Sequence, residues 1–554
     1  MTSAAILFEP DGYVLNGPKL MGRQAAGHAF LRAAVAGRGT QPVFAYTPFE
    51  RSAALFANAV QAIDASAPPH WVPGDRLDLL GKIGTLYLPG PDLNTQARLR
   101  LRAGPGAYSL VGVTHTTASH GAMDSITSLL AAPVMPWDAL ICTSAAVVHT
   151  VQELLRAELD HLRWRFGSAV QPTLPQFPVI PLGVHCADYQ LVEGERARAR
   201  SALGIGPDEV VALFVGRLSF HAKAHPHAMY QGLQAAVARS GKSVVLLQSG
   251  WFANDAIEAC FRGGAEQFCP DVRSMFADGR DPLARRQAWA AADLFVSLSD
   301  NIQETFGLTP IEAMAAGLPV VVTDWDGYKD TVREGVDGFR IPTWMPPPNV
   351  GETFARAHEA GVDNYDMYCG LTCQTVAVDG AVLADRLAAL IGDAALRQRM
   401  GEAGRRQASA VYDWGVVYRQ YQQLWEALAD RRRAAVQAGD RLLRGAPACA
   451  PSRMDPYRSF GAYPSRLIQP DSLVALRPGA DMGRFAGLAG HGLFNYATKV
   501  LPSADVVERI MGALADQPLS VNTLAARTTM MLGPLILALA VMAKMDLLVF
   551  SSDL

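Results

Sequence analysis

Two cationic residues and two glutamates are the side chains of this sequence best suited to chemistry. Arg217 and Lys223 follow the apolar run VVALFVG, which reads as a buried strand. Glu304 and Glu312 enclose the segment TFGLTPI. A guanidinium and an ammonium at the end of a strand suit a diphosphate, because both neutralise the charge that develops as a bond to it breaks. The pattern predicts a site for a diphosphate ester.

The segment from Trp289 to Thr343 predicts a strand, a polar loop, a short helix and a second strand. Thr309 is the expected N-cap, Pro310 fits the first helical position, and Glu312 completes a capping box with the threonine. Gly317 is expected to end the helix. The loop before the helix therefore offers free backbone N–H groups, and an anion such as a phosphate is stabilised there.

Each of these residues also has an ordinary structural interpretation. Glu312 alone fits a capping box, and Glu304 alone fits a solvated loop carboxylate. Arg217 or Lys223 alone fits an exposed surface cation. The functional interpretation is favoured because all four occur together, each in the context of a predicted strand or helix end.

The stretch ETFGLTPIEAMAAGLPVV resembles the signature of the retaining glycosyltransferases of family 4, which have the GT-B fold. The GRL…K spacing and the IPLGV segment near Ile180 are similar to further motifs of that family. The resemblance covers about residues 1 to 430 and implies a nucleotide-sugar donor. Carried onto this sequence, it implies Glu304 for the donor sugar, Arg217, Lys223, Phe306, Gly307 and Leu308 for the diphosphate, and Glu312 for the ribose.

The first third of the chain has the pattern of a doubly wound α/β domain, with short apolar runs alternating with helical stretches. His115 follows the run SLVGVT, so we expect it at the carboxyl edge of the sheet, where ligands bind. It is suited to donating a hydrogen bond to a sugar or phosphate, and a structural loop histidine is the alternative. The resemblance supports a sugar contact for His115. It also implies that Gly22 approaches the donor, although the first loop lacks the family's adjacent glycine pair.

Length and composition predict a globular chain of two or three domains, since it has 554 residues, of which 50% are hydrophobic. Two Rossmann-like, doubly wound domains facing a cleft are expected, followed by a small, mostly helical domain. A net charge of −3 gives no overall reason to bind nucleic acid. Seven cysteines without CxxC pairs fit a cytoplasmic protein, and no signal peptide is expected. The predicted parts are 1–188 (acceptor side), 189–432 (donor side), 433–453 (linker) and 454–554 (accessory domain).

The accessory domain is predicted to contain three helices, at 504–515, 521–528 and 532–545, followed by a strand at 547–550. This order is winged-helix-like. DNA binding is disfavoured because the last helix carries Lys544 and no arginine. A membrane span is disfavoured because the uncharged run is only about 14 residues long. We expect a packing domain, or one that docks a protein partner or a second copy.

We therefore predict a cytoplasmic, retaining glycosyltransferase that acts by same-face displacement on a glycan, lipid-linked or protein acceptor. The cations replace a metal, so neither a metal nor a cofactor is expected. A nucleotide-sugar epimerase, a sugar phosphorylase and a nucleotide-sugar-binding scaffold are the alternatives. The nucleotide, the sugar and the acceptor are not predicted. Peripheral contact with the inner face of the membrane stays open because Arg98, Arg100, Arg102, Arg163 and Arg165 could form basic surface, although solvated helix faces are the favoured interpretation of these arginines.

Overall fold

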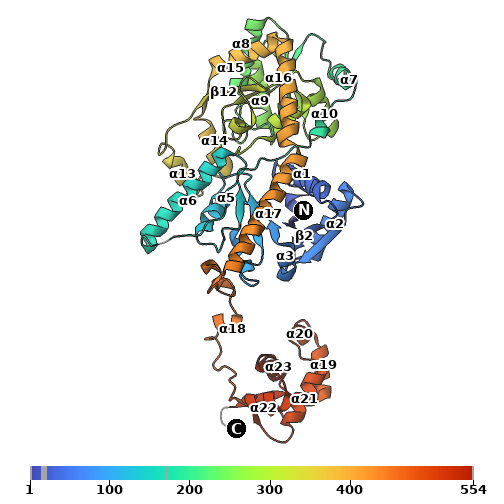
Figure 1. The fold of residues 1–554 in the computed structure, drawn as a ribbon, viewed down its shortest axis with the longest axis vertical. Coiled ribbons are helices and arrows are strands. Elements are labelled where there is room, and N and C mark those ends of the chain that lie inside the picture. Colours follow the sequence, from blue (N-terminus) through green and yellow to red (C-terminus); the bar gives the residue numbers. More distant parts are fainter. Residues whose placement is uncertain (1–2, 14–21, 170, 552–554) are drawn as a thin grey trace. The chain divides into compact units, whose positions relative to one another are not determined.

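The computed structural model describes residues 3–13, 22–169 and 171–551. The chain forms two compact units, Met1–Ala450 and Pro451–Leu554, which are described separately (Figure 1). The larger unit contains two six-stranded parallel sheets. The first sheet ends in sequence at Ile141 and the second begins at Val210. The predicted boundary at residue 188 lies between them and remains a prediction.

The first sheet has the strand order β3-β2-β1-β4-β5-β6, and every pair of neighbours is parallel. Its central strands are buried on both faces because helices cover both. The strands are β1 (Ala5–Leu7), β2 (Val43–Thr47), β3 (Pro69–Pro73), β4 (Thr85–Tyr87), β5 (Ser109–Val113) and β6 (Ala139–Ile141). The main helices are α1 (Gly22–Gly37), α2 (Glu50–Ile63), α3 (Leu77–Ile83), α4 (Asn94–Arg100), α5 (His120–Thr127) and α6 (Ala145–Phe166).

The second sheet has the order β12-β11-β10-β7-β8-β9, again fully parallel. Counted from its own first strand, this is the same winding as in the first sheet, so the prediction of two doubly wound, Rossmann-like domains is confirmed. The strands are β7 (Val210–Val215), β8 (Val244–Gly250), β9 (Arg273–Asp278), β10 (Leu294–Ser297), β11 (Val320–Thr323) and β12 (Gly338–Ile341). The flanking helices are α7 (Glu195–Ala202), α8 (His227–Ser240), α9 (Asp255–Phe268), α10 (Pro282–Ala291), α11 (Leu308–Ala316), α12 (Tyr328–Thr331), α15 (Gly380–Gly392) and α16 (Ala394–Gln407).

An insertion follows β12 in the second domain. It consists of a two-stranded ribbon, β13 (Thr343–Trp344) with β14 (Ala377–Val378), that encloses the helices α13 (Glu352–Glu359) and α14 (Tyr365–Cys373). This insertion was not predicted, because its sequence carries none of the motifs on which the resemblance rests.

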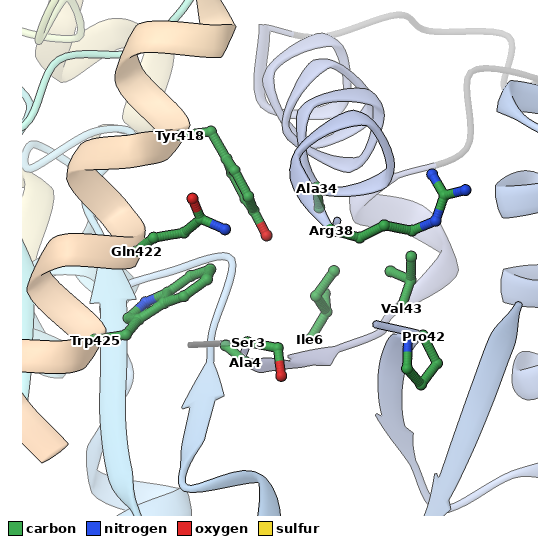
Figure 2. Close-up of a pocket in the computed structure, with 10 residues that line it drawn as sticks. All are labelled: Ser3, Ala4, Ile6, Ala34, Arg38, Pro42, Val43, Tyr418, Gln422 and Trp425. Atoms are coloured by element: carbon green, nitrogen blue, oxygen red, sulfur yellow. The ribbon is translucent and has the colours of Figure 1, made fainter. Parts of the chain in front are cut away.

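The long helix α17 (Trp414–Ala438) returns from the second domain to pack on the first, as the resemblance implied. Figure 2 shows Tyr418, Gln422 and Trp425 projecting from α17 toward α1 and the first strands. The amide nitrogen of Gln422 donates to the carbonyl of Gly37 at 3.1 Å. The cavity between these elements has a volume of about 20 Å³, which is room for roughly one water molecule. The contact between α17 and the first domain is therefore a packing interface.

One arginine of the suggested basic surface is buried. Arg100 is 0% exposed and makes two bonds to the carboxylate of Asp138, at 2.6 and 2.7 Å. The same carboxylate accepts the backbone N–H of Leu110 at 2.8 Å, so the pair braces α4 against β5. The suggestion that Arg100 contributes to a membrane-facing surface is wrong, because its guanidinium is buried and paired with Asp138 inside the domain.

The smaller unit is mostly helical with a three-stranded antiparallel sheet, ordered β16-β15-β17. The run α21-β16-α22-α23-β17 has the winged-helix order that the sequence predicts. No single helix in the described residues meets the length and hydropathy of a membrane span; α22 and α23 meet them only together, with a 110° bend between them. The elements of the smaller unit are α18 (Pro456–Ser459), β15 (Leu473–Leu476), α19 (Met482–Gly490), α20 (Gly492–Asn495), α21 (Ala504–Leu514), β16 (Leu519–Ser520), α22 (Val521–Thr528), α23 (Leu532–Lys544) and β17 (Leu548–Ser551).

Candidate functional site

The strands β7 and β10 bring the predicted cations and the first glutamate to one edge. They are neighbours, paired at Leu294 and Ala212, and the winding of the sheet reverses between them. Arg217 and Lys223 follow β7, whereas Glu304 follows β10. Ligands of open α/β sheets bind in the crevice at such a reversal. The topology therefore places these residues where a ligand is expected.

Lys223 and Glu304 form an ion pair between Nζ and Oε2. The side chain of Glu304 is only 10% exposed and that of Lys223 is 28% exposed. Burial raises the pKa of Glu304, but the Lys223 ammonium and the backbone N–H groups of Phe306 and Thr305 outweigh burial, so the pKa lies below its ordinary value. Glu304 is therefore a carboxylate at neutral pH and can only accept hydrogen bonds.

Arg217 is held beside this pair by two hydrogen bonds. One guanidinium nitrogen, Nη2, donates to the carbonyl of Ala222 and to the side-chain oxygen of Gln303, both at 2.8 Å. The amide nitrogen of Gln303 in turn donates to the hydroxyl of Tyr365 in the insertion at 3.2 Å. Sequence reasoning missed Gln303 and Tyr365. The loop after β10 thus positions both predicted diphosphate-binding cations.

The helix α11 begins two residues earlier than expected, at Leu308. Its N-cap is Gly307, which has a φ of +80°, and no side chain caps the helix. The predictions that Thr309 is the N-cap and that it forms a capping box with Glu312 are therefore wrong. The reason is the backbone turn at Gly307: a Cβ there would lie 1.9 Å from Cε1 of Tyr328, so only glycine fits. Gly317 ends the helix in the left-handed conformation, as predicted.

The N-terminus of α11 supplies two backbone donors. The N–H groups of Gly307 and Leu308 donate to no acceptor within the described part of the chain. The N–H of Phe306 differs, since it already donates to the carboxylate of Glu304. The helix dipole adds partial positive charge at this point. Of the three amides implied by the resemblance, those of Gly307 and Leu308 are thus available to an anion.

Glu312 lies on the first turns of α11 and is half-buried. Burial raises the pKa of its carboxyl group, and a hydrogen bond with the hydroxyl of Tyr189 opposes that rise. The structure therefore gives Glu312 a tyrosine partner in place of the expected capping contact. Its predicted role at the ribose remains a prediction.

The first domain contributes the loop after β5. The hydroxyl of Thr305 donates to the carbonyl of His115 at 3.0 Å, so His115 lies next to the Glu304 loop. The hydroxyls of Thr116 and Tyr365 lie 3.4 Å apart. Gly22 is the first residue of α1, and the loop before it, residues 14–21, is outside the described residues. The structure thus brings His115 into the site and leaves the contact expected of Gly22 a prediction.

Two aspartates that follow β11 contact the first domain, Asp326 in the loop and Asp330 in α12. The hydroxyl of Ser144 donates to Oδ1 of Asp326 at 2.8 Å. The backbone N–H of Ala145 donates to Oδ2 of Asp330 at 2.7 Å, at the start of α6, where an anion is stabilised. Burial raises the pKa of Asp326 to about 7. Sequence reasoning missed these contacts because the partners are distant in the chain.

The cysteines of α14 lie close to the loop after β10. Cys373 is buried, and its thiol donates to Oδ1 of Asp300 at 3.1 Å. Burial also raises the pKa of Asp300 to about 7. Among the described residues, no group of three or more histidine, cysteine or acidic side chains is arranged to hold a metal ion.

Comparisons with known proteins place this geometry in a family context. Residues 209–360 match the family model Glycosyl transferases group 1. The D-inositol 3-phosphate glycosyltransferase of Nocardia farcinica is 27% identical over 311 residues, which are 54% of this chain and 56% of that protein. The phosphatidyl-myo-inositol mannosyltransferase of Mycobacterium leprae is 31% identical over 150 residues, 27% of this chain and 30% of that protein. The chain thus spans about half, or less, of the length of these curated relatives.

Among solved structures, HepE of Anabaena in complex with UDP aligns with a TM-score of 0.47 and 16% identity, over 77% of this chain and 100% of that one. The segment that matches the family contains Arg217, Lys223, Glu304 and the start of α11, whereas His115 and Gly22 lie outside it. The resemblance predicted from the motifs is confirmed over residues 209–360, which match the model of the group 1 glycosyltransferases and lie in a unit that contains two doubly wound parallel sheets.

Proposed function

We propose that the protein is a retaining glycosyltransferase that transfers a sugar from a nucleotide-sugar donor to a glycan, lipid-linked or protein acceptor. The observation that carries the proposal is the Lys223–Glu304 ion pair, set beside Arg217 where the winding of the second sheet reverses. The names of the matched relatives, which describe glycosyl and mannosyl transfer, favour the same reaction class. A location in the cytoplasm, with peripheral contact at the inner membrane face, is part of the proposal.

Each side chain has a role in this proposal that follows from its chemistry. Arg217 and Lys223 neutralise the diphosphate, and the N–H groups of Gly307 and Leu308 add dipolar stabilisation. Glu304, ionised and buried, accepts hydrogen bonds from hydroxyls of the donor sugar. His115 contacts the sugar from the first domain. Glu312 binds the ribose.

The reaction proceeds by same-face displacement. The bond between the sugar's anomeric carbon and the diphosphate oxygen breaks, and the acceptor oxygen forms a bond to the same face of that carbon. The proton of the acceptor hydroxyl moves to the departing diphosphate. The two cations and the helix N-terminus offset the charge on the diphosphate, so the proposed reaction uses neither a metal ion nor a cofactor.

A donor panel tests the proposal. The purified protein is incubated with UDP-, GDP-, ADP- and dTDP-sugars, with and without added glycans, and nucleotide release is followed. We expect release from one donor and a rate at least about a hundredfold lower in Glu304→Gln. Glu402→Gln is the matched control, because Glu402 is an exposed residue of α16.

The alternatives give different results in the same assay. An epimerase changes the donor sugar without releasing the nucleotide, and a phosphorylase requires inorganic phosphate. A binding scaffold binds one donor and releases nothing with any acceptor. Any of these results, or an unchanged rate in Glu304→Gln, would contradict the proposed transfer.

A further inference from the structure

A second pocket lies at the carboxyl edge of the first sheet. It has a volume of about 840 Å³ and is lined by residues at the ends of β1, β2 and β3, together with α4. The size is that of a small-molecule site. None of the residues of the proposed donor site lines it.

Aromatic side chains form one part of the lining and are held in place by hydrogen bonds. The indole nitrogen of Trp71 donates to the carbonyl of Thr47 at 2.9 Å, while the side chain as a whole is 37% exposed. The hydroxyl of Tyr46 donates to the carbonyl of Gly74 at 2.8 Å. Phe49, at 68% exposed, adds a third ring. Tyr46 is buried, so the exposed rings are those of Trp71 and Phe49, and these suit the apolar face of a ring-shaped ligand.

Among the described residues, the polar part of the lining accepts hydrogen bonds and carries no positive charge. Glu9 and Asp75 contribute carboxylates, and none of the described lining residues is lysine, arginine or histidine. The lining therefore favours an uncharged ligand with many hydroxyls and disfavours a phosphate or a uronic acid.

The strand order gives the distance between this pocket and the donor site. His115 follows β5, and the strands β1, β2 and β3 are two, three and four inter-strand steps away from β5. At about 4.8 Å a step, these strands lie roughly 10, 14 and 19 Å from β5. A single sugar ring is too short to reach from one site to the other. A ligand that uses both must be an extended chain.

We propose that this pocket binds the distal end of an uncharged oligosaccharide acceptor, whose reactive end lies beside His115. The inference rests on the proposed function and narrows its acceptor to a neutral glycan several sugars long. Trp71 and Phe49 stack on sugar rings, and Asp75 accepts hydrogen bonds from the sugar hydroxyls.

The test measures binding without any donor, so it is independent of turnover. An array of neutral oligosaccharides, with uronic-acid oligosaccharides of equal length, is screened with the full chain. Calorimetry then compares the best neutral ligand with its monosaccharide. We expect at least one neutral oligosaccharide to bind about tenfold or more tighter than its monosaccharide and than every acidic chain.

Variants connect that binding to the pocket. Trp71→Ala should weaken it about tenfold. Trp164→Ala should leave it unchanged, since Trp164 is a 78% exposed residue of α6 outside the lining. Phe49→Ala gives a second readout if Trp71→Ala fails to fold.

The outcomes separate the two proposals. Oligosaccharide binding that needs Trp71, without nucleotide release from any donor, supports the pocket and contradicts the transferase. Nucleotide release without binding to any neutral oligosaccharide overturns the pocket alone. Preference for acidic chains, or equal binding by Trp71→Ala and Phe49→Ala, also overturns it.

Discussion

The two parallel sheets of the larger unit share one strand order but differ at their carboxyl edges. In the second sheet, the backbones at the ends of β7 and β8 are in close contact and leave no space between them. A Cβ on Gly250 would lie only 2.0 Å from the carbonyl oxygen of Gly216. In the first sheet, the corresponding ends of β1 and β2 open onto the 840 Å³ pocket. The second edge carries Arg217 and Lys223, whereas no described lining residue of the pocket is cationic.

This difference separates what topology decides from what side chains decide. The winding of each sheet determines where a ligand can lie, namely beyond the carboxyl ends of the strands. The residues of the loops determine which ligand it is. One edge suits an anion and the other suits a neutral, hydroxyl-rich chain, as a donor diphosphate and a glycan acceptor would require.

The largest effect is expected when the carboxyl edge of the second sheet loses the ammonium group of Lys223. In Lys223→Met we expect nucleotide release to fall by about 10²- to 10³-fold, because the diphosphate loses a cation and Glu304 loses its partner. Loss of the Lys223 ammonium raises the pKa of Glu304 relative to the native protein, because burial is then opposed only by the backbone N–H groups, so the acid limb of the pH–rate profile moves to higher pH. Steady-state rates between pH 4 and 8 measure both effects.

Lys242→Met is the matched control, because Lys242 is exposed in the turn before β8. Its rate and profile should equal those of the native protein. An unchanged acid limb in Lys223→Met would show that the ion pair does not control the ionisation of Glu304.

The turn that presents the α11 amides gives the second-largest effect. Gly307→Ala should lower the free energy of unfolding by about 3 kcal/mol or more, since its Cβ would overlap the buried ring of Tyr328. Gly335→Ala is the control: Gly335 has a φ of +73°, but no atom lies within 4 Å of its Cβ position, so the cost should be only about 1 kcal/mol. Urea denaturation measures both, and equal losses would refute the steric argument.

A substitution that keeps the charge of Arg217 tests whether its guanidinium geometry matters at the carboxyl edge of the second sheet. Arg217→Lys should lower the rate of nucleotide release about tenfold, because an ammonium cannot reproduce the guanidinium contacts to Ala222 and Gln303 while also facing a diphosphate. Steady-state kinetics with the accepted donor measure the change. Arg239→Lys, an exposed change on α8, is the control. A native rate in Arg217→Lys would mean that charge alone suffices.

Much of the fold could be predicted because its signals are local. Buried parallel strands appear as short apolar runs, and these predicted both doubly wound sheets. In the smaller unit, α22 (Val521–Thr528) was predicted with the observed bounds, because a serine cap and an apolar face mark it. The motif residues Lys223 and Glu304 were also predicted, and the structure pairs them.

Other features could not be predicted because they depend on distant partners. The cap of α11 moved to Gly307 because the tertiary contact with Tyr328 outweighs the local preference for Thr309. Trp71 and Gln96 line one pocket only because separate strands and a helix end beside each other. Their sequence spacing carries no pattern, and neither do the contacts of the insertion.

The smallest predicted effect concerns the hydrogen bond between Ser144 of the first domain and Asp326 of the second. Burial raises the folded-state pKa of Asp326 to about 7, above the ordinary value of an aspartate. The folded state therefore binds a proton that the unfolded state releases, and this stabilisation is lost as pH rises from about 4 through 7. In Asp326→Asn the side chain stays neutral, still accepts from Ser144, and suits the positive φ of 39°.

The stability of Asp326→Asn relative to the native protein should rise by about 1–2 kcal/mol between pH 5 and 8, less than full linkage because the side chain keeps some contact with water. Asp300, whose pKa is also raised by burial to about 7, is present in both proteins, so its contribution cancels in the difference. Urea denaturation at several pH values measures the difference, with the exposed Asp255→Asn as control. A difference that does not change with pH would mean that Asp326 is ionised in the folded protein and that Ser144 binds a carboxylate.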